Sequence, residues 1–298
     1  MDYLRPRTWQ DAVALKTEHP DTVPISGGTD LMVEINFARR RPSSLLDLSH
    51  LGALRRWTKS NGEVELGAGV TYTDVLEDLR HDLPALAIAS RTVGSPQIRN
   101  RGTIAGNLAT ASPAGDAHPP LLATGATVRI ESMRGVRDVP IGGFFTGPKR
   151  NVLEPDELIR SVVVPRARGP QQFSKVGTRN AMVIAVVSFA LALDVPGRRV
   201  GTGIGSAAPT PIEAIEASAY LDRELARGGY WEDHRELAPG VVDRFARLVA
   251  SAARPIDDVR GPAGYRVHAL RVMARRTLCW AWSSLEVWDR ADRVDGQR

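Results

Sequence analysis

The sequence has very little cysteine, with Cys279 as the single example among 298 residues. One thiol excludes an internal disulfide and cannot supply the four ligands that an iron–sulfur cluster usually takes, so any cluster is expected on another chain. The chain also lacks a run of about 18 apolar residues, and Asp2, Arg5 and Arg7 stand where a secretory signal would be apolar. We therefore predict no membrane span, no secretory signal and a cytoplasmic location.

Aromatic residues are also scarce, at 6%, and the net charge is only +5. The basic residues gather at 266–276 and near the chain end, without interleaved aromatic rings on which bases would stack, so no nucleic-acid binding is expected. Four histidines have no spacing with cysteine or carboxylates that suits a metal ion, which predicts no metal site; they are His50, His81, His118 and His268.

The length favours two packed domains, and the irregular order of expected elements favours an α+β fold over a doubly wound sheet. Spacing and capping signals predict helices at about 8–20, 31–37, 71–79, 83–92, 211–221, 239–252 and 264–282, and strands at 22–25, 64–66, 126–130, 159–164, 182–193 and 199–204. Leu31, Met32, Ile35 and Phe37 are expected to face a core. Residues 99–116 show little periodicity and are expected to be mostly loop.

Residues 26–30, Ser-Gly-Gly-Thr-Asp, place two glycines between an expected strand and an expected helix. Such a turn leaves backbone N–H groups open to an anion and lets a diphosphate come close to the chain. By itself the pattern is weak evidence for a site, because glycine pairs at strand-to-helix turns are commonly ordinary turns.

Residues 102–116 concentrate glycines, hydroxyls, one amide and one carboxylate. Hydroxyls and free N–H groups donate to phosphate oxygens, whereas a carboxylate repels them and accepts from ribose hydroxyls, so Asp116 is expected beside a sugar. The alternative is an irregular surface loop, although loops of this length usually have a function.

Two other patterns resemble functional sites, but their context predicts structural roles. The run Gly201-Thr202-Gly203-Ile204-Gly205-Ser206 resembles a dinucleotide fingerprint, but prolines follow where its helix would begin, so strand and turn are predicted. Trp280, Trp282 and Trp288 are expected to serve packing or a subunit interface.

Together these loops make the sequence similar to the FAD-binding medium subunit of the molybdenum hydroxylases, the xanthine dehydrogenase and carbon monoxide dehydrogenase family. The family's Gly-Gly-Thr-Asp-Leu-like turn matches 27–31, and its Thr-Ile-Gly-Gly-Asn-like loop matches 103–107. Resemblances continue at 145–149, 156–159, 173–179, 207–211 and 264–268. One departure is Ala105, which replaces the first glycine of the second motif and puts the placement of the diphosphate in doubt.

The resemblance implies a fold of the vanillyl-alcohol oxidase and p-cresol methylhydroxylase type over residues 1–172, with subdomains of about 1–55 and 56–172, and a C-terminal α+β domain over 173–298. It also implies a noncovalent FAD, with diphosphate at 26–30 and 103–110, the ribose at Asp116 and the flavin ring at Ile159 and Lys175, whose charge would favour an anionic reduced ring. The cofactor-binding residues so implied are Ile25, Ser26, Gly27, Gly28, Thr29, Asp30, Leu31, Thr103, Ile104, Gly106, Asn107, Thr110, Ser112, Asp116, Ile159 and Lys175.

The implied activity is electron transfer within an oxidoreductase, with no residue of this chain acting as nucleophile or acid. A large molybdopterin subunit would hydroxylate the substrate, and two-iron two-sulfur clusters on a small subunit would pass electrons to FAD, in a dimer of heterotrimers. The substrate stays open, as does the acceptor, which is NAD, oxygen or a quinone. Two alternatives remain, a self-contained flavin oxidoreductase and a scaffold subunit without a cofactor.

Overall fold

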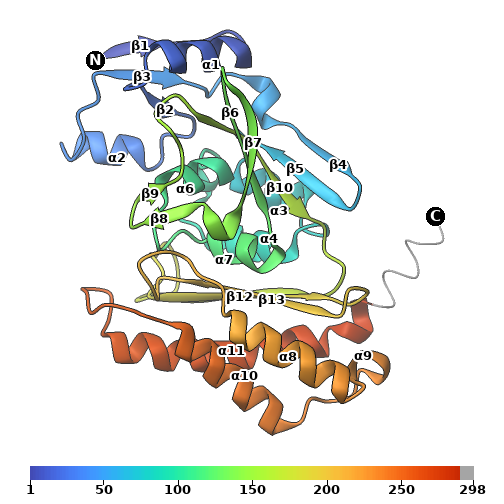
Figure 1. Ribbon diagram of the computed structural model, residues 1–298. Helices are drawn as coiled ribbons and strands as arrows, with labels where there is room; N and C mark the ends of the chain where they lie inside the picture. Colours follow the sequence, from blue (N-terminus) through green and yellow to red (C-terminus); the bar gives the residue numbers. More distant parts are fainter. Residues whose placement is uncertain (289–298) are drawn as a thin grey trace.

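The first tier of the computed structural model, which describes residues 1–288, is a small parallel sheet with helices beside it (Figure 1). Its strands β1 (Asp2–Leu4), β2 (Val23–Ile25) and β3 (Ser44–Asp47) lie in the order β1-β3-β2, and its helices are α1 (Trp9–Glu18) and α2 (Leu31–Asn36). Helix α1 begins as predicted, because the Thr8 hydroxyl accepts from the Asp11 N–H while the Asp11 carboxylate accepts from the Thr8 N–H.

Helix α2 does not contribute to a core, so the prediction that Leu31, Met32, Ile35 and Phe37 face inward is wrong. None of the residues of α2 is buried, and Phe37 is 69% exposed. The helix has only six residues and no second layer covers it, so its apolar spacing finds nothing to pack against. An ion pair between Glu34 and Lys149 instead ties it to the middle tier, with Nζ 2.5 Å from Oε1.

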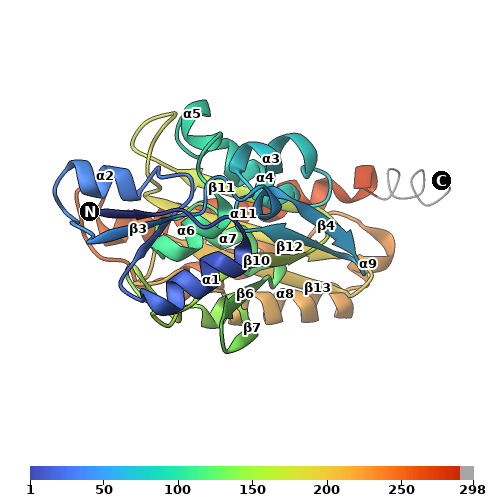
Figure 2. The same ribbon diagram turned by 90° about the horizontal axis from the view of Figure 1, so that it is seen from above.

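The middle tier is a five-stranded antiparallel sheet in the order β4-β5-β10-β6-β7. Its strands are β4 (Trp57–Ser60), β5 (Glu63–Gly67), β6 (Thr127–Ser132), β7 (Gly135–Pro140) and β10 (Leu158–Pro165), and its helices include α3 (Tyr72–Asp78) and α4 (Pro84–Arg91). Short elements surround it: the 3-10 turns η1 (Gly52–Arg55) and η2 (Ile141–Gly143) and the hairpin β8 (Phe145–Gly147) and β9 (Arg150–Asn151). Seen from above, α3 and α5 (Pro96–Arg99) lie on the side opposite the β6–β7 hairpin (Figure 2).

Residues 99–116 lie mostly outside helices and strands, as predicted, but they contain a short helix that the prediction did not include. They follow α5 (Pro96–Arg99) and contain α6 (Ile104–Thr110), and α7 (His118–Thr124) begins just after them. Helix α6 is two turns long, capped by Thr103 and ended by Ala111 in the left-handed region at φ of 48°. So short a helix shows only one apolar repeat, Ile104 to Leu108, which explains why the sequence did not reveal it.

The third tier is an antiparallel sheet, β11 (Gln171–Val176), β12 (Val187–Asp194) and β13 (Arg199–Gly205), in the order β11-β12-β13. Helices α4 and α7 cover one face and α8 (Ile215–Arg227), α10 (Pro239–Ala252) and α11 (Ala263–Ser283) the other, with the short α9 (Tyr230–Asp233) beside α8 (Figure 1). The strand expected from Met182 begins later, at Val187, and the helix expected from Pro211 begins at Ile215. Trp282 packs on Trp231, with ring centroids 5.7 Å apart, as predicted for a packing residue.

The glycines of 201–205 serve the contact between the tiers, which confirms that this run is strand rather than a dinucleotide motif. A Cβ atom at Gly201 would lie 1.8 Å from the carbonyl oxygen of Ala123, and one at Gly203 would lie 2.0 Å from that of Pro119. Strand β13 therefore approaches α7 backbone to backbone. Through residue 288, no helix has both the length and the apolar character needed to cross a membrane.

Candidate functional site

The two glycine-containing segments that the sequence singled out, 26–30 and 102–116, meet in the structure. A Cβ atom at Gly27 would lie 1.9 Å from the carbonyl oxygen of Arg101, so the two backbones touch where glycine has no side chain. Farther along, the Thr110 hydroxyl donates to the Asp30 carboxylate at 3.3 Å. Gly28, at φ of 74°, makes the turn that leads from β2 into α2.

A cavity of about 50 Å³ lies at this junction and is bordered by hydrogen-bond donors. Its lining includes two arginines and no carboxylate, and it consists of Ser26, Gly27, Leu48, Ser49, Arg55, Gly69, Thr71, Asn100, Arg101 and Thr103. Two guanidinium groups with surrounding hydroxyls form an environment that favours an anion.

The sequence reasoning missed several members of this lining. Asn100 and Arg101 directly precede the loop that was singled out, so extending the motif by two residues would have found them. Arg55 is 46 residues away from Arg101 in the chain, and only the packing of η1 beside Gly69 brings it to the cavity. No local pattern in the sequence marks it.

Ala105, the departure from the family motif, fits its position. It lies in the first turn of α6, buried, and its φ is not positive. The methyl group therefore packs into the core and carries no backbone strain.

Thr103 holds the beginning of α6 in place, because its hydroxyl accepts from the Gly106 N–H at 2.9 Å. We expect Thr103→Ala to lower the free energy of unfolding by about 1 kcal/mol, the usual cost of losing an N-cap. Urea unfolding followed by circular dichroism measures this, and Thr103→Ser, which keeps the hydroxyl, should differ little from wild type. Equal losses in the two variants would contradict the cap as the cause.

Asp116 and Lys175 form a buried ion pair that joins the loop after α6 to strand β11. The Lys175 Nζ lies 2.6 Å from Asp116 Oδ2, and both side chains are more than nine-tenths buried. Burial raises the pKa of Asp116 from 3.8 to about 6, while the Lys175 ammonium opposes the shift. The second carboxylate oxygen, Oδ1, is buried without a hydrogen-bond partner in the described part of the chain, so it can accept from a ligand hydroxyl.

The fully buried side chain of His118 packs under the 102–116 segment and holds it in place. It is fully buried, its Nε2 lies 3.1 Å from the Asn107 carbonyl oxygen, and its ring packs on Phe145 at 4.7 Å between centroids. Burial lowers the pKa of His118 to about 4, so the ring is neutral at pH 7. A Cβ atom at Gly115 would lie 2.3 Å from this ring, which explains the glycine there.

The other residues expected at the cofactor are distributed around the same junction with different exposure. Asn107 accepts from the Ala117 N–H at 3.4 Å, and Ser112 accepts from the Ala114 N–H at 3.3 Å, so both shape the loop itself. Ile159 is 7% exposed and belongs to the main core cluster. Ile25, Thr29 and Leu31 are half-buried and flank the glycine turn.

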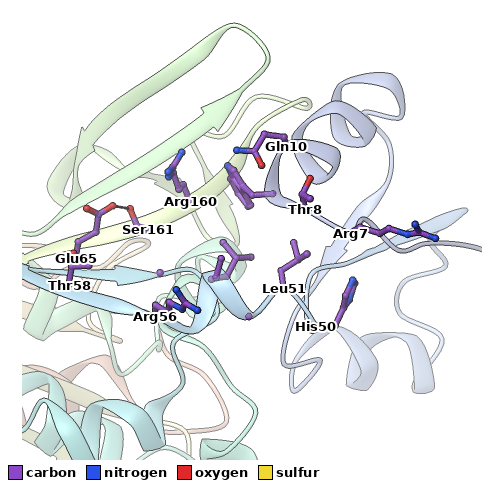
Figure 3. Close-up of a pocket in the computed structure, with 15 residues that line it drawn as sticks. Arg7, Thr8, Gln10, His50, Leu51, Arg56, Thr58, Glu65, Arg160 and Ser161 are labelled. Carbon is purple, nitrogen blue, oxygen red and sulfur yellow. Dashed lines mark hydrogen bonds between the residues drawn. The ribbon is translucent and has the colours of Figure 1, made fainter.

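A second cavity, of about 620 Å³, is a separate groove between α1 and the five-stranded sheet (Figure 3). None of the residues predicted from the sequence to bind the cofactor lines it. Within residues 1–288, no group of three or more histidine, cysteine or carboxylate side chains is placed to hold a metal ion.

Comparison with protein families defines the class of this protein. Residues 1–167 match the model for the FAD binding domain in molybdopterin dehydrogenase, and residues 172–281 match that for the CO dehydrogenase flavoprotein C-terminal domain. This class consists of flavin-binding components of oxidoreductases.

Individual relatives agree with that class. The chain is 36% identical to the nicotinate dehydrogenase FAD-subunit of Eubacterium barkeri over 67% of its length and 71% of the relative's. It is 29% identical to the xanthine dehydrogenase FAD-binding subunit of Escherichia coli O157:H7, with 93% and 94% covered. A carbon monoxide dehydrogenase structure from Hydrogenophaga pseudoflava aligns with a TM-score of 0.86 at 27% identity, covering 96% and 98% of the chains. The chain belongs to the family of FAD-binding medium subunits of molybdenum hydroxylases, and the expected α+β fold is confirmed.

Proposed function

We propose that this chain holds FAD noncovalently between its two glycine-containing segments and passes electrons from iron–sulfur clusters on a partner subunit to an acceptor. The observation that carries the proposal is the cavity between Gly27 and Thr103, bordered by Arg55 and Arg101 and by no carboxylate. A diphosphate bears the charge that such a lining stabilises. FAD, when bound, supplies the redox chemistry, and the protein supplies position and electrostatics.

The proposed roles follow from the chemistry of each side chain. Ser26, Thr103 and the backbone N–H groups of the 26–30 turn would donate to the diphosphate, and Arg55 and Arg101 would neutralise its charge. Asp116 Oδ1, buried without a partner in the described chain, suits a ribose hydroxyl. Lys175 places a positive charge beside the same site, where it would favour an anionic ring. Ile159 would provide an apolar contact for the ring.

The proposed partners are a large molybdopterin subunit and a small subunit with two-iron two-sulfur clusters, assembled as a dimer of heterotrimers. Support comes from the single cysteine, which cannot ligate a cluster, and from the lack of a metal-ligand group in residues 1–288. Relatives named as FAD subunits of nicotinate and xanthine dehydrogenases support the same division of labour. NAD, oxygen or a quinone would accept the electrons.

The alternatives are less well supported. A self-contained oxidoreductase needs a substrate pocket beside the flavin, yet none of the residues proposed to bind FAD lines the cavity of about 620 Å³. A scaffold without a cofactor has no need for an unpartnered buried oxygen at Asp116 or for two arginines around a small polar cavity.

The purified chain should carry one FAD that acid precipitation releases into the supernatant, because no histidine or cysteine is assigned to covalent attachment. It should reduce a dye with an artificial electron donor but should not oxidise any hydroxylase substrate by itself. Visible spectra before and after precipitation, together with dye reduction and substrate assays, measure these points. A colourless chain would support the scaffold, and substrate turnover by the isolated chain would support the self-contained enzyme.

A further inference from the structure

The groove between α1 and the outer face of the five-stranded sheet has no role in the function proposed above. Helix α1 contributes Gln10, its N-cap Thr8 also lines the groove, and strands β4, β5 and β10 contribute polar side chains including Ser161 (Figure 3). Leu51 and Leu54 also line it, but both are more than nine-tenths buried and belong to the core. Its volume of about 620 Å³ is that of a binding site rather than of a packing defect.

The charge of the groove is positive. Three arginines, Arg7, Arg56 and Arg160, line it against one glutamate, Glu65, which already lies 3.1 Å from the Arg129 guanidinium. Arg7 and Arg56 have no ion-pair partner among residues 1–288. Arg160 forms an ion pair with Glu131, with its guanidinium nitrogen 2.6 Å from Glu131 Oε2. Unpaired guanidinium groups at the border of an open groove attract carboxylates or phosphates.

The arrangement favours an extended ligand over a small anion or a nucleotide. Arg56 directly follows η1, whereas Arg160 belongs to β10, and their guanidinium groups lie apart in Figure 3, so they do not converge on one phosphate. The Trp9 ring, the only tryptophan, tyrosine or phenylalanine side chain in the lining among residues 1–288, is 8% exposed, and its Nε1 donates to Glu131 at 2.8 Å. No open ring face is therefore available for a base to stack on.

We propose that the groove docks an acidic segment of a partner subunit, with the carboxylates of that segment at the exposed Arg56 and Arg160. The inference rests on the proposed function, because it requires that the chain works within a complex. The turn η1 borders both cavities. Its residues 52–54 line the groove, and its last residue, Arg55, lines the small cavity proposed to hold the diphosphate. Docking and cofactor binding would thus use opposite sides of one turn.

The first test uses the FAD-bound full chain and a fluorescein-labelled peptide of alternating glutamate and leucine. We expect saturable binding that weakens with salt, and a loss of affinity of at least roughly tenfold in Arg56→Glu/Arg160→Glu. The matched control is Arg247→Glu, an exposed arginine of α10 on the far tier, which should leave binding unchanged. FAD absorbance is read in the same samples, so a missing cofactor, which would count against the proposed function, is distinguished from a failure of the groove.

Three results would overturn the inference. In the first, the peptide shows no saturable binding. In the second, Arg247→Glu loses as much peptide affinity as Arg56→Glu/Arg160→Glu. In the third, inorganic pyrophosphate binds through Arg56 and Arg160 as tightly as the peptide. The last would make the groove a small-anion site. In the co-expressed complex, a photo-crosslinking amino acid at Gln10 should attach to an acidic peptide of a partner subunit, identified by mass spectrometry. Attachment to a segment without carboxylates, or to none, would equally contradict docking.

Discussion

Replacing Gly27 by alanine should strip FAD from the chain while leaving it folded. The added Cβ would lie 1.9 Å from the Arg101 carbonyl oxygen, a backbone atom that cannot rotate away, so the two segments around the small cavity must separate. Overpacking of this kind costs about 1–3 kcal/mol, which corresponds to a rise of roughly tenfold to a hundredfold in the Kd for FAD if it is expressed fully in binding. Flavin fluorescence titration of the FAD-free chain measures it.

The matched control for this prediction is Gly143→Ala. Gly143 belongs to the same domain, has an ordinary φ and would place its Cβ in open space, so the variant should bind FAD like wild type. Circular dichroism spectra of both variants report folding. Wild-type affinity in Gly27→Ala would remove the 26–30 turn from the proposed diphosphate site.

Lys175→Met should cause the largest loss of stability of the variants considered. It keeps the length and packing of the side chain but leaves the Asp116 carboxylate buried without its ammonium partner, 2.6 Å away in the wild type. Breaking a buried pair in this way costs about 3–5 kcal/mol. Urea unfolding of the FAD-free chain at pH 8 measures the loss.

The same variant should be less impaired in acid. In the wild type, burial raises the pKa of Asp116 from 3.8 to about 6, so the folded chain keeps a proton there that the unfolded chain has released. Protons therefore favour the folded state, and the contribution of this group to stability falls as the pH rises from about 4 to about 6. In Lys175→Met no ammonium opposes the effect of burial, so the pKa of Asp116 rises further and the loss of folding stability extends to higher pH. Unfolding curves at pH 5 and pH 8 should show the smaller defect at pH 5.

The control for Lys175→Met is the double variant Lys175→Met/Asp116→Asn. An amide of the same shape has no charge to bury, so much of the stability at pH 8 should return and its pH dependence should flatten. If the double variant is no more stable than Lys175→Met, then lost packing rather than an unpaired charge is the cause. Neither variant involves the acceptor or the partner subunits, so the result bears on this chain alone.

The sequence determined the features that depend on near neighbours in the chain. The Thr8–Asp11 and Thr71–Asp74 caps and the glycine turn at 27–28 need only residues within four positions, and each is formed as expected. The resemblance to the medium-subunit family also rested on local motifs, and the family models match at both domains. The roles of the residues proposed to hold FAD remain predictions.

Tertiary structure decided what depends on contacts between distant segments. The apolar spacing of α2 predicted burial, yet no layer covers that helix, because periodicity describes a helix face but not whether another element opposes it. Asp116 and Lys175 are 59 residues apart, and only the packing of the third tier on α7 pairs them. Arg55 reaches the small cavity because η1 packs against Gly67, the last residue of β5. Gly201 and Gly203 are needed because β13 meets α7 without side chains between them. Contacts of this kind arise from the close packing of whole elements, so no short window of the sequence contains them.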